Sequence, residues 1–234
     1  MTRVVGHRGA MAVCAENTLA SFDRAERDGA AAVELDVHLS ADARLVVIHD
    51  PTVDRTAVGG RQQGEVAELT WAELQEVELA DGQRIPSLEA ALGVLRTEVH
   101  VEIKAPAAAL PAAELVLREE LQDRAMLISF DLDALAEVRR RSTRLRLGVI
   151  STEPTAVALD AVRELEAVQL AAQSPFLTPE LTGRLQTAGV QVCGWPVRTE
   201  EELQQALAAR VDLVTADDPA WCRDRLAALA GAPI

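Results

Sequence analysis

The chain has 234 residues, of which 49% are hydrophobic and 26% charged, so it can fill one sizeable hydrophobic core. It holds 23 basic and 37 acidic residues, a net charge of -14, which argues against nucleic-acid binding and against stable docking on an anionic membrane. No apolar run has the length of a transmembrane helix, and residues 1–6 lack a signal-peptide pattern. We therefore expect a cytoplasmic protein with a single domain, residues 1–234.

Nine short apolar segments recur along the chain, and amphipathic segments separate most of them. We predict strands at 4–7, 32–37, 45–49, 99–104, 126–130, 145–150, 168–170, 190–195 and 212–215. Apolar residues at three- and four-residue spacing predict helices at 132–138 and 156–165. Thr178-Pro179, Asp218-Pro219 and the capping box of Thr199 and Glu202 mark further helix starts. Alternating strands and helices indicate an α/β fold with a parallel sheet.

One connection, residues 40–44, is too short for a parallel crossover and predicts an antiparallel hairpin between 32–37 and 45–49. A turn centred on residues 42 and 43 would set Asp36 directly opposite His49. The other eight strands fit a closed (β/α)8 TIM barrel, with this hairpin as an extension after the second strand. An open doubly wound sheet is the alternative, although no glycine-rich phosphate loop follows the first strand. Residues 51–86 are predicted to form a short insertion or lid with one helix near 71–77.

Polar residues gather at the predicted carboxyl ends of the first strands, where the sites of such barrels lie. They are His7, Arg8, Glu34, Asp36, His49, Asp50, Glu102 and Lys104. Successive side chains of a strand point to opposite faces, so the acids share one face while their apolar neighbours face the helices. Lys104 is the single lysine in a chain with 22 arginines, and it ends one of these strands.

Glu34, Asp36 and Glu102 would repel one another inside a barrel unless a cation were bound. Three carboxylates without a nearby cysteine suit Mg²⁺ or Ca²⁺ better than zinc. Arg8 and Lys104 supply positive charge for an anionic group such as a phosphate. His7 and His49 on opposite sides of such a phosphate would form an acid–base pair. These residues together suggest metal-assisted cleavage of a phosphodiester.

Several short motifs resemble the glycerophosphodiester phosphodiesterase family, whose barrel is shared with phosphoinositide-specific phospholipase C. The resemblance extends over nearly the whole chain, through His7-Arg8-Gly9, Glu16-Asn17-Thr18, Glu34-Leu35-Asp36-Val37, His49-Asp50-Pro51, Val101-Glu102-Ile103-Lys104, Ser129-Phe130, Trp195 and Asp217-Asp218-Pro219. Ala15, Pro196 and Ala216 depart from the family's pattern, but none of them is one of the three acids or the two histidines.

The resemblance implies hydrolysis of glycerophosphodiesters to sn-glycerol 3-phosphate and an alcohol, through a cyclic phosphate. It implies one divalent cation (Mg²⁺ or Ca²⁺, with Mn²⁺ an option) on the three acids. It implies His7 and His49 as general base and acid in either order, with Arg8 and Lys104 on the phosphate. Trp195 and Phe130 are expected in the substrate pocket, which takes a small-molecule diester.

Three alternatives remain open from the sequence. A lysophospholipase D or another phospholipase C-like phosphodiesterase could use the same residues. A Schiff-base lyase could use Lys104, although the adjacent Glu102 opposes the lowered pKa that such a nucleophile needs. A barrel that binds phosphoesters without catalysis is the alternative of another class. We interpret His38 and His100, which match no motif, as structural. Asn17 is interpreted as a loop hydrogen bond or helix cap, with a remote metal or substrate contact as the alternative, while Asp50 either orients a neighbour or begins a turn.

Overall fold

Eight parallel strands close into a barrel in the computed structural model, which describes residues 1–60 and 63–231. The barrel strands are β1 (Arg3–Gly6), β2 (Ala32–Leu39), β4 (Glu98–Ile103), β5 (Ala125–Ser129), β6 (Arg146–Ser151), β7 (Gln169–Gln173), β8 (Gln191–Val197) and β9 (Leu213–Ala216). Pairing of β1 with both β2 and β9 closes the ring. The (β/α)8 prediction is therefore confirmed, and the open sheet is excluded.

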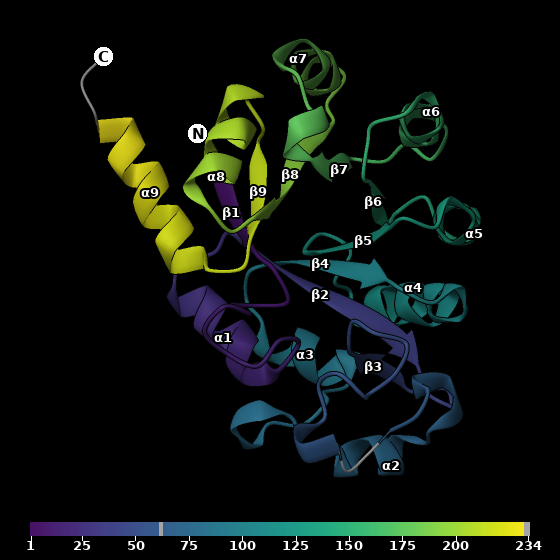
Figure 1. The fold of residues 1–234 in the computed structure, drawn as a ribbon. Helices are drawn as coiled ribbons and strands as arrows, with labels where there is room; N and C mark the ends of the chain where they lie inside the picture. The colour runs from purple at the N-terminus through teal and green to yellow at the C-terminus, as the bar shows by residue number, and fades with distance from the viewer. Residues whose placement is uncertain (61–62, 232–234) are drawn as a thin grey trace.

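Helices surround the strands, as Figure 1 shows. They are α1 (Leu19–Arg27), α2 (Trp71–Glu76), α3 (Leu88–Val94), α4 (Ala109–Arg118), α5 (Leu132–Arg141), α6 (Ala156–Glu164), α7 (Pro179–Thr187), α8 (Glu200–Ala208) and α9 (Pro219–Gly231). The predicted helix starts hold, because Thr178 and Thr199 cap α7 and α8 and the Asp218 side chain accepts from the amide of Trp221. No helix of the described ranges is long and apolar enough to cross a lipid bilayer.

The buried apolar residues of the first strands form two clusters, one between the strands and the helices and one inside the barrel. Val33, Leu35 and Val37 of β2 belong to a large core shared with the helices, which includes Phe22 of α1. A smaller cluster, with Ala32 and Met126 among its members, occupies the barrel interior. Alternation along β2 thus directs Glu34 and Asp36 to the inside, as predicted.

The β2–β3 hairpin is antiparallel as predicted, but its register differs by one residue. β3 (Leu45–Val47) pairs Val37 with Val47 and Leu39 with Leu45, and the amide of Ile48 donates to the carbonyl of Asp36. The prediction that Asp36 lies directly opposite His49 is therefore wrong. The turn is longer than assumed: Ala43 has a φ of 60°, the left-handed residue that closes a three-residue hairpin loop.

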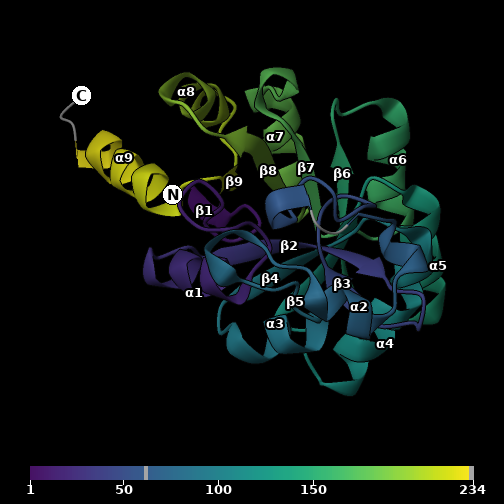
Figure 2. The same cartoon turned by 60° about the horizontal axis from the view of Figure 1, so that its bottom comes forward.

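Residues 51–86 contain no strand of the barrel within the part that the structure describes, and residues 61–62 of this predicted insertion lie outside it. The segment instead holds three short 3-10 turns, Val58–Gly60, Val66–Glu68 and Ala80–Gly82, together with the predicted helix, α2. An apolar cluster of its own joins it to Val46 and Ile48 beside β3. In Figure 2, α2 and β3 lie side by side on one flank of the barrel.

Candidate active site

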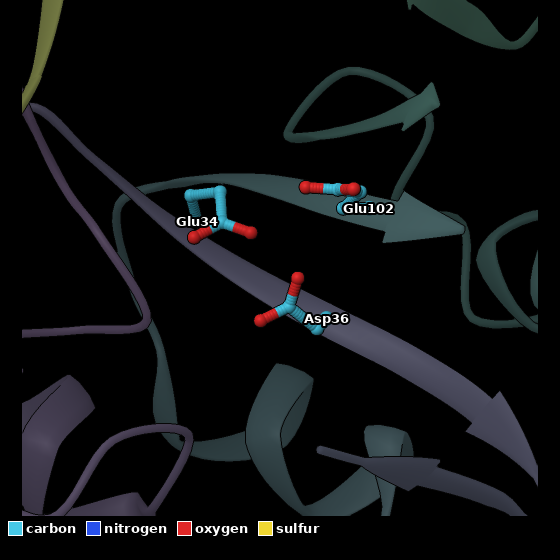
Figure 3. Close-up of side chains that lie close together, drawn as sticks. All are labelled: Glu34, Asp36 and Glu102. Atoms are coloured by element: carbon cyan, nitrogen blue, oxygen red, sulfur yellow. The ribbon is translucent and has the colours of Figure 1, made fainter. Parts of the chain in front are cut away.

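Three carboxylates meet inside the barrel near its mouth. Glu34 and Asp36 come from β2 and Glu102 from β4, whose parallel register pairs Asp36 with Glu102. One oxygen from each lies within 4.8 Å of the others, and Figure 3 shows the side chains facing a common space. Glu34 and Asp36 are buried, while the Glu102 side chain is 12% exposed. The predicted acidic residues are thus brought together.

The electrostatics of these acids fit a bound cation. Burial, reinforced by the charges of Asp36 and Glu102, raises the pKa of Glu34 well above its usual value. Burial and the charge of Asp36 likewise raise the pKa of Glu102. The buried Oε1 of Glu34 has no hydrogen-bond partner among the residues that the structure describes. An oxygen-only set with an unpaired buried atom suits a hard divalent ion.

Lys104 lies between the acids and one of the histidines. Its Nζ is 2.8 Å from Glu102 Oε1, 3.7 Å from Asp36 Oδ1 and 3.1 Å from His49 Nε2. Burial acts to lower the pKa of Lys104, but the charges of Glu102 and Asp36 outweigh it, so the pKa is raised. This charged state opposes the Schiff-base alternative, which needs a neutral amine.

Arg8 is the second cation of the site. Its backbone amide donates to Glu34 Oε2 at 2.9 Å, while its guanidinium lies 3.0 Å from Glu16 Oε1 and 3.4 Å from Asp36 Oδ2. A φ of 49° at Arg8 bends the chain directly after β1, which allows both amide and side chain to reach the acids. Arg8 therefore links the acidic cluster to the loop that precedes α1.

Each of the two predicted histidines has a carboxylate partner. The Nδ1 atom of His7 is 2.6 Å from Asp217 Oδ1, and that of His49 is 2.6 Å from Asp50 Oδ1. Burial lowers the pKa of His49 despite the opposing charge of Asp36 and the bond to Asp50. A carboxylate on Nδ1 fixes the ring orientation and leaves Nε2 for chemistry.

A cavity of about 250 Å³ lies above the acids. It is lined by the predicted site residues His7, Arg8, Glu34, His49, Glu102 and Lys104, and by Ile128, Phe130, Ile150, Ala171, Trp195, Pro196, Arg198 and Thr215. Phe130 and Trp195 pack edge to face with ring centroids 5.6 Å apart. Both predicted aromatic residues thus lie in the same cavity as the two histidines and the two cations.

Sequence reasoning missed four contacts of this site. Asn17 is not a cap: its amide donates to Asp36 Oδ2 at 2.7 Å, and Thr18 caps α1. Asp217, which belongs to the last of the family motifs, contacts His7. Arg55, from the insertion, contacts both Asp50 and Glu16. In a closed barrel the last strand pairs with the first, so the residue after β9, Asp217, could have been expected beside His7, the residue after β1.

The remaining histidines lie outside the cavity. His38 is buried, with its Nε2 atom 3.1 Å from the carbonyl oxygen of His49. His100 is buried 3.6 Å from Glu98 Oε1. Both contacts agree with the interpretation of His38 and His100 as structural residues.

The fold and the site together define a class of protein: a (β/α)8-barrel enzyme whose acidic centre and two histidines share one cavity. Residues 7–221 match the Glycerophosphoryl diester phosphodiesterase family. The chain is 32% identical, over 93% of its length and 95% of the relative's, to a glycerophosphodiester phosphodiesterase of Caldanaerobacter subterraneus subsp. tengcongensis.

Solved structures agree with this match. A glycerophosphodiester phosphodiesterase from Parabacteroides distasonis has a TM-score of 0.82 and 27% identity, with 98% of each chain covered. An Oleispira antarctica phosphodiesterase, solved in complex with the product sn-glycerol-3-phosphate, shares the fold with a TM-score of 0.88, 23% identity and 97% coverage of each chain. This chain belongs to the glycerophosphoryl diester phosphodiesterase family.

Proposed function

We propose that this protein hydrolyses glycerophosphodiesters to sn-glycerol 3-phosphate and an alcohol. The observation that carries the proposal is the convergence of three carboxylates within 4.8 Å of one another with two carboxylate-bound histidines around one cavity. The family match and the product named for the Oleispira antarctica structure support it.

We propose that Glu34, Asp36 and Glu102 hold one divalent cation, Mg²⁺ or Ca²⁺. A cation of this kind supplies positive charge to the oxygens of the phosphodiester when it is bound. Arg8 and Lys104 add positive charge from the protein, Arg8 with a planar guanidinium and Lys104 as a point charge. A phosphate would compete with the carboxylates that these two side chains contact now.

The histidines supply the proton transfers. In the first step the glycerol 2-hydroxyl oxygen forms a bond to phosphorus, and its proton passes to Nε2 of one histidine. The bond from phosphorus to the alcohol oxygen breaks, and the other histidine gives that oxygen a proton. Water then opens the cyclic phosphate with the two roles exchanged. Lys104 can only donate to His49 Nε2, so in this structure the His49 ring is an acceptor there and neutral.

We further propose that residues 1–234 act as one domain, with 51–86 as its lid. Trp195 and Phe130 are proposed to form the wall against the organic part of the substrate. The cytoplasmic location and the lack of nucleic-acid and membrane partners stay predictions from composition.

The test is release of glycerol 3-phosphate from a panel of glycerophosphodiesters. We expect His7→Ala and His49→Ala each to lower kcat by roughly 10²- to 10⁴-fold, the usual contribution of a general acid or base. Circular dichroism shows whether the variants remain folded. Full activity after either substitution would contradict the proposal, and tight binding without turnover in the unmodified protein would favour the phosphoester-binding alternative.

A further inference from the structure

Arg55 of the insertion reaches two carboxylates that contact residues of the catalytic cavity. Its Nε donates to Asp50 Oδ2 at 2.5 Å, and its two terminal nitrogens donate to Glu16, to Oε2 at 2.9 Å and to Oε1 at 2.7 Å. The Asp50 carboxylate also contacts Nδ1 of His49 at 2.6 Å. The Glu16 carboxylate also accepts from the guanidinium of Arg8 at 3.0 Å. One guanidinium thus connects a proposed acid–base histidine with a proposed phosphate-binding arginine.

The turn that carries Arg55 is held in place by its neighbours. The side chain of Val53 is completely buried in the apolar cluster that joins the insertion to β3. The amide of Val53 donates to the carbonyl of Gly64, and its carbonyl accepts from the amide of Ala57. These contacts fix the backbone around Arg55 independently of its side chain. A fixed backbone reduces the entropic cost that makes most exposed ion pairs weak.

Glu16 lies between two guanidinium groups, and its side chain is only 13% exposed. Burial acts to raise the pKa of this carboxyl, but the hydrogen bond from Arg55 and the charges of Arg8 and Arg55 outweigh it, so the pKa is lowered. Arg55 binds both carboxylate oxygens, the bidentate geometry that holds a carboxylate most firmly, whereas Arg8 forms a single bond. Arg8 can therefore turn toward a phosphate while Glu16 keeps a partner.

We propose that Arg55 is a positioning residue for the hydrolysis of the phosphodiester. By fixing Asp50, it keeps the His49 ring in place for proton transfer. By holding Glu16, it leaves the Arg8 guanidinium able to bind the phosphate. This inference rests on the proposed function, because it assigns Arg55 a part in that reaction, and it makes one turn of the insertion a part of the active site.

The experiment measures kcat and KM separately, at saturating metal, for the glycerophosphodiester that the unmodified protein hydrolyses best. Arg55→Ala should lower kcat by about tenfold, because a displaced His49 ring transfers protons less well. It should also raise KM by about threefold, because Arg8 then becomes the remaining cation on Glu16 and binds phosphate less readily. Arg55→Lys should restore neither value, since an ammonium group cannot form three bonds in the plane of a guanidinium.

Double variants show whether Arg55 acts through the two carboxylates. In an Asp50→Asn background, Arg55→Ala should lower kcat by less than about threefold, because the contact that it supports is already weakened. In a Glu16→Gln background, Arg55→Ala should leave KM within about twofold, because a neutral amide no longer competes with the phosphate for Arg8. Equal losses in every background would overturn the inference, because Arg55 would then contribute to stability alone.

Arg24→Ala is the matched control, because the Arg24 side chain is 44% exposed against 48% for Arg55 and its Nε donates to Asp28 at the end of α1. It should leave kcat and KM within about twofold. Circular dichroism checks the folding of each variant, and Arg55→Gln replaces Arg55→Ala if the alanine variant does not fold. Unchanged kinetics in the Arg55 variant, or an equal loss in Arg24→Ala, would overturn the inference while leaving the proposed function intact. Failure of the unmodified protein to hydrolyse any glycerophosphodiester would instead count against the proposed function itself.

Discussion

His7 and His49 take their orientation from residues in different parts of the chain. Asp50 is the immediate neighbour of His49, whereas Asp217 follows the last barrel strand and reaches His7 only because β9 pairs with β1. Both bonds are 2.6 Å long and engage Nδ1. The carboxylates therefore hold each ring so that Nε2 faces the cavity, which makes Asp50 and Asp217 positioning residues.

Asp50→Asn and Asp217→Asn are expected to lower kcat by about 10- to 100-fold, less than loss of either imidazole, because the ring remains but its orientation is weakened. The bond to Asp50 raises the pKa of His49 against the effect of burial. Its loss lowers that pKa further, so the His49 limb of the pH–rate profile should move to lower pH in Asp50→Asn. An unchanged limb would show that Asp50 does not set the state of His49.

The loop that follows β1 is held in a shape that depends on glycine. Gly9 has a φ of 86°, and a Cβ there would lie 2.6 Å from the backbone carbon of Ser21. The Ser21 hydroxyl also donates to the carbonyl of Arg8, so this contact between the loop and α1 sets the position of the arginine. The loop after β1 thus places Arg8 beside Glu34 and Asp36.

Gly9→Ala should destabilise the protein by about 1–3 kcal/mol, because it adds backbone strain and a clash with α1. Gly93→Ala is the matched control in α3, where a Cβ would meet nothing within 4 Å. That change should be neutral or stabilising by up to about 1 kcal/mol, since alanine is the better helix former. Urea unfolding measures the change in stability of both variants. Equal changes would contradict the claim that the fold depends on the shape of the loop at Gly9.

Besides its apolar cluster, the insertion contacts the residues around the active site through one arginine, Arg55. Arg55 Nε lies 2.5 Å from Asp50 Oδ2, and the same guanidinium lies 2.7 Å from Glu16 Oε1. This ion pair is the main cause that lowers the pKa of Asp50 to about 2 from its ordinary value of 3.8. A lowered carboxyl pKa stabilises the fold above pH 3.8, and that contribution is lost as the pH falls through about 2.

Arg55→Gln should therefore lower the free energy of unfolding at pH 6 by a small amount, up to about 1 kcal/mol for exposed ion pairs of this kind. The difference from the unmodified protein should shrink between pH 4 and pH 2, as Asp50 is protonated in both proteins. Urea unfolding across this range checks the sign. A difference that grows toward low pH would contradict it.

The barrel was predictable from the sequence because each strand is a short apolar segment that can be recognised without knowing its neighbours in space. The inward direction of the acids was predictable for a similar reason, since charged and apolar residues alternate along 32–37 and 99–104. The hairpin register was not, because it depends on the left-handed φ of Ala43, a residue with no strong turn signal. The contacts of Asp217 and Arg55 depend on barrel closure and on the path of the insertion, which no local pattern encodes.

At the scale of the molecule, most of the net charge of -14 lies outside the site, but three of the 37 acids are concentrated in one interior cluster. The raised pKa values of Glu34 and Glu102, together with the unpaired oxygen of Glu34, mean that the cluster is strained without a cation. We expect the metal-free protein to gain thermal stability when Mg²⁺ or Ca²⁺ is added. The Glu34→Gln variant should lose that gain, because it lacks one of the three charges.

The most direct test of the account is glycerol 3-phosphate release by the metal-stripped protein as Mg²⁺, Ca²⁺ and Mn²⁺ are titrated in turn. The account predicts no turnover in EDTA, saturable recovery with at least one of these ions, and no recovery in Glu34→Gln at the same concentrations. Undiminished hydrolysis by the stripped protein, or full recovery in Glu34→Gln, would contradict the claim that the three acids hold a cation needed for phosphodiester cleavage.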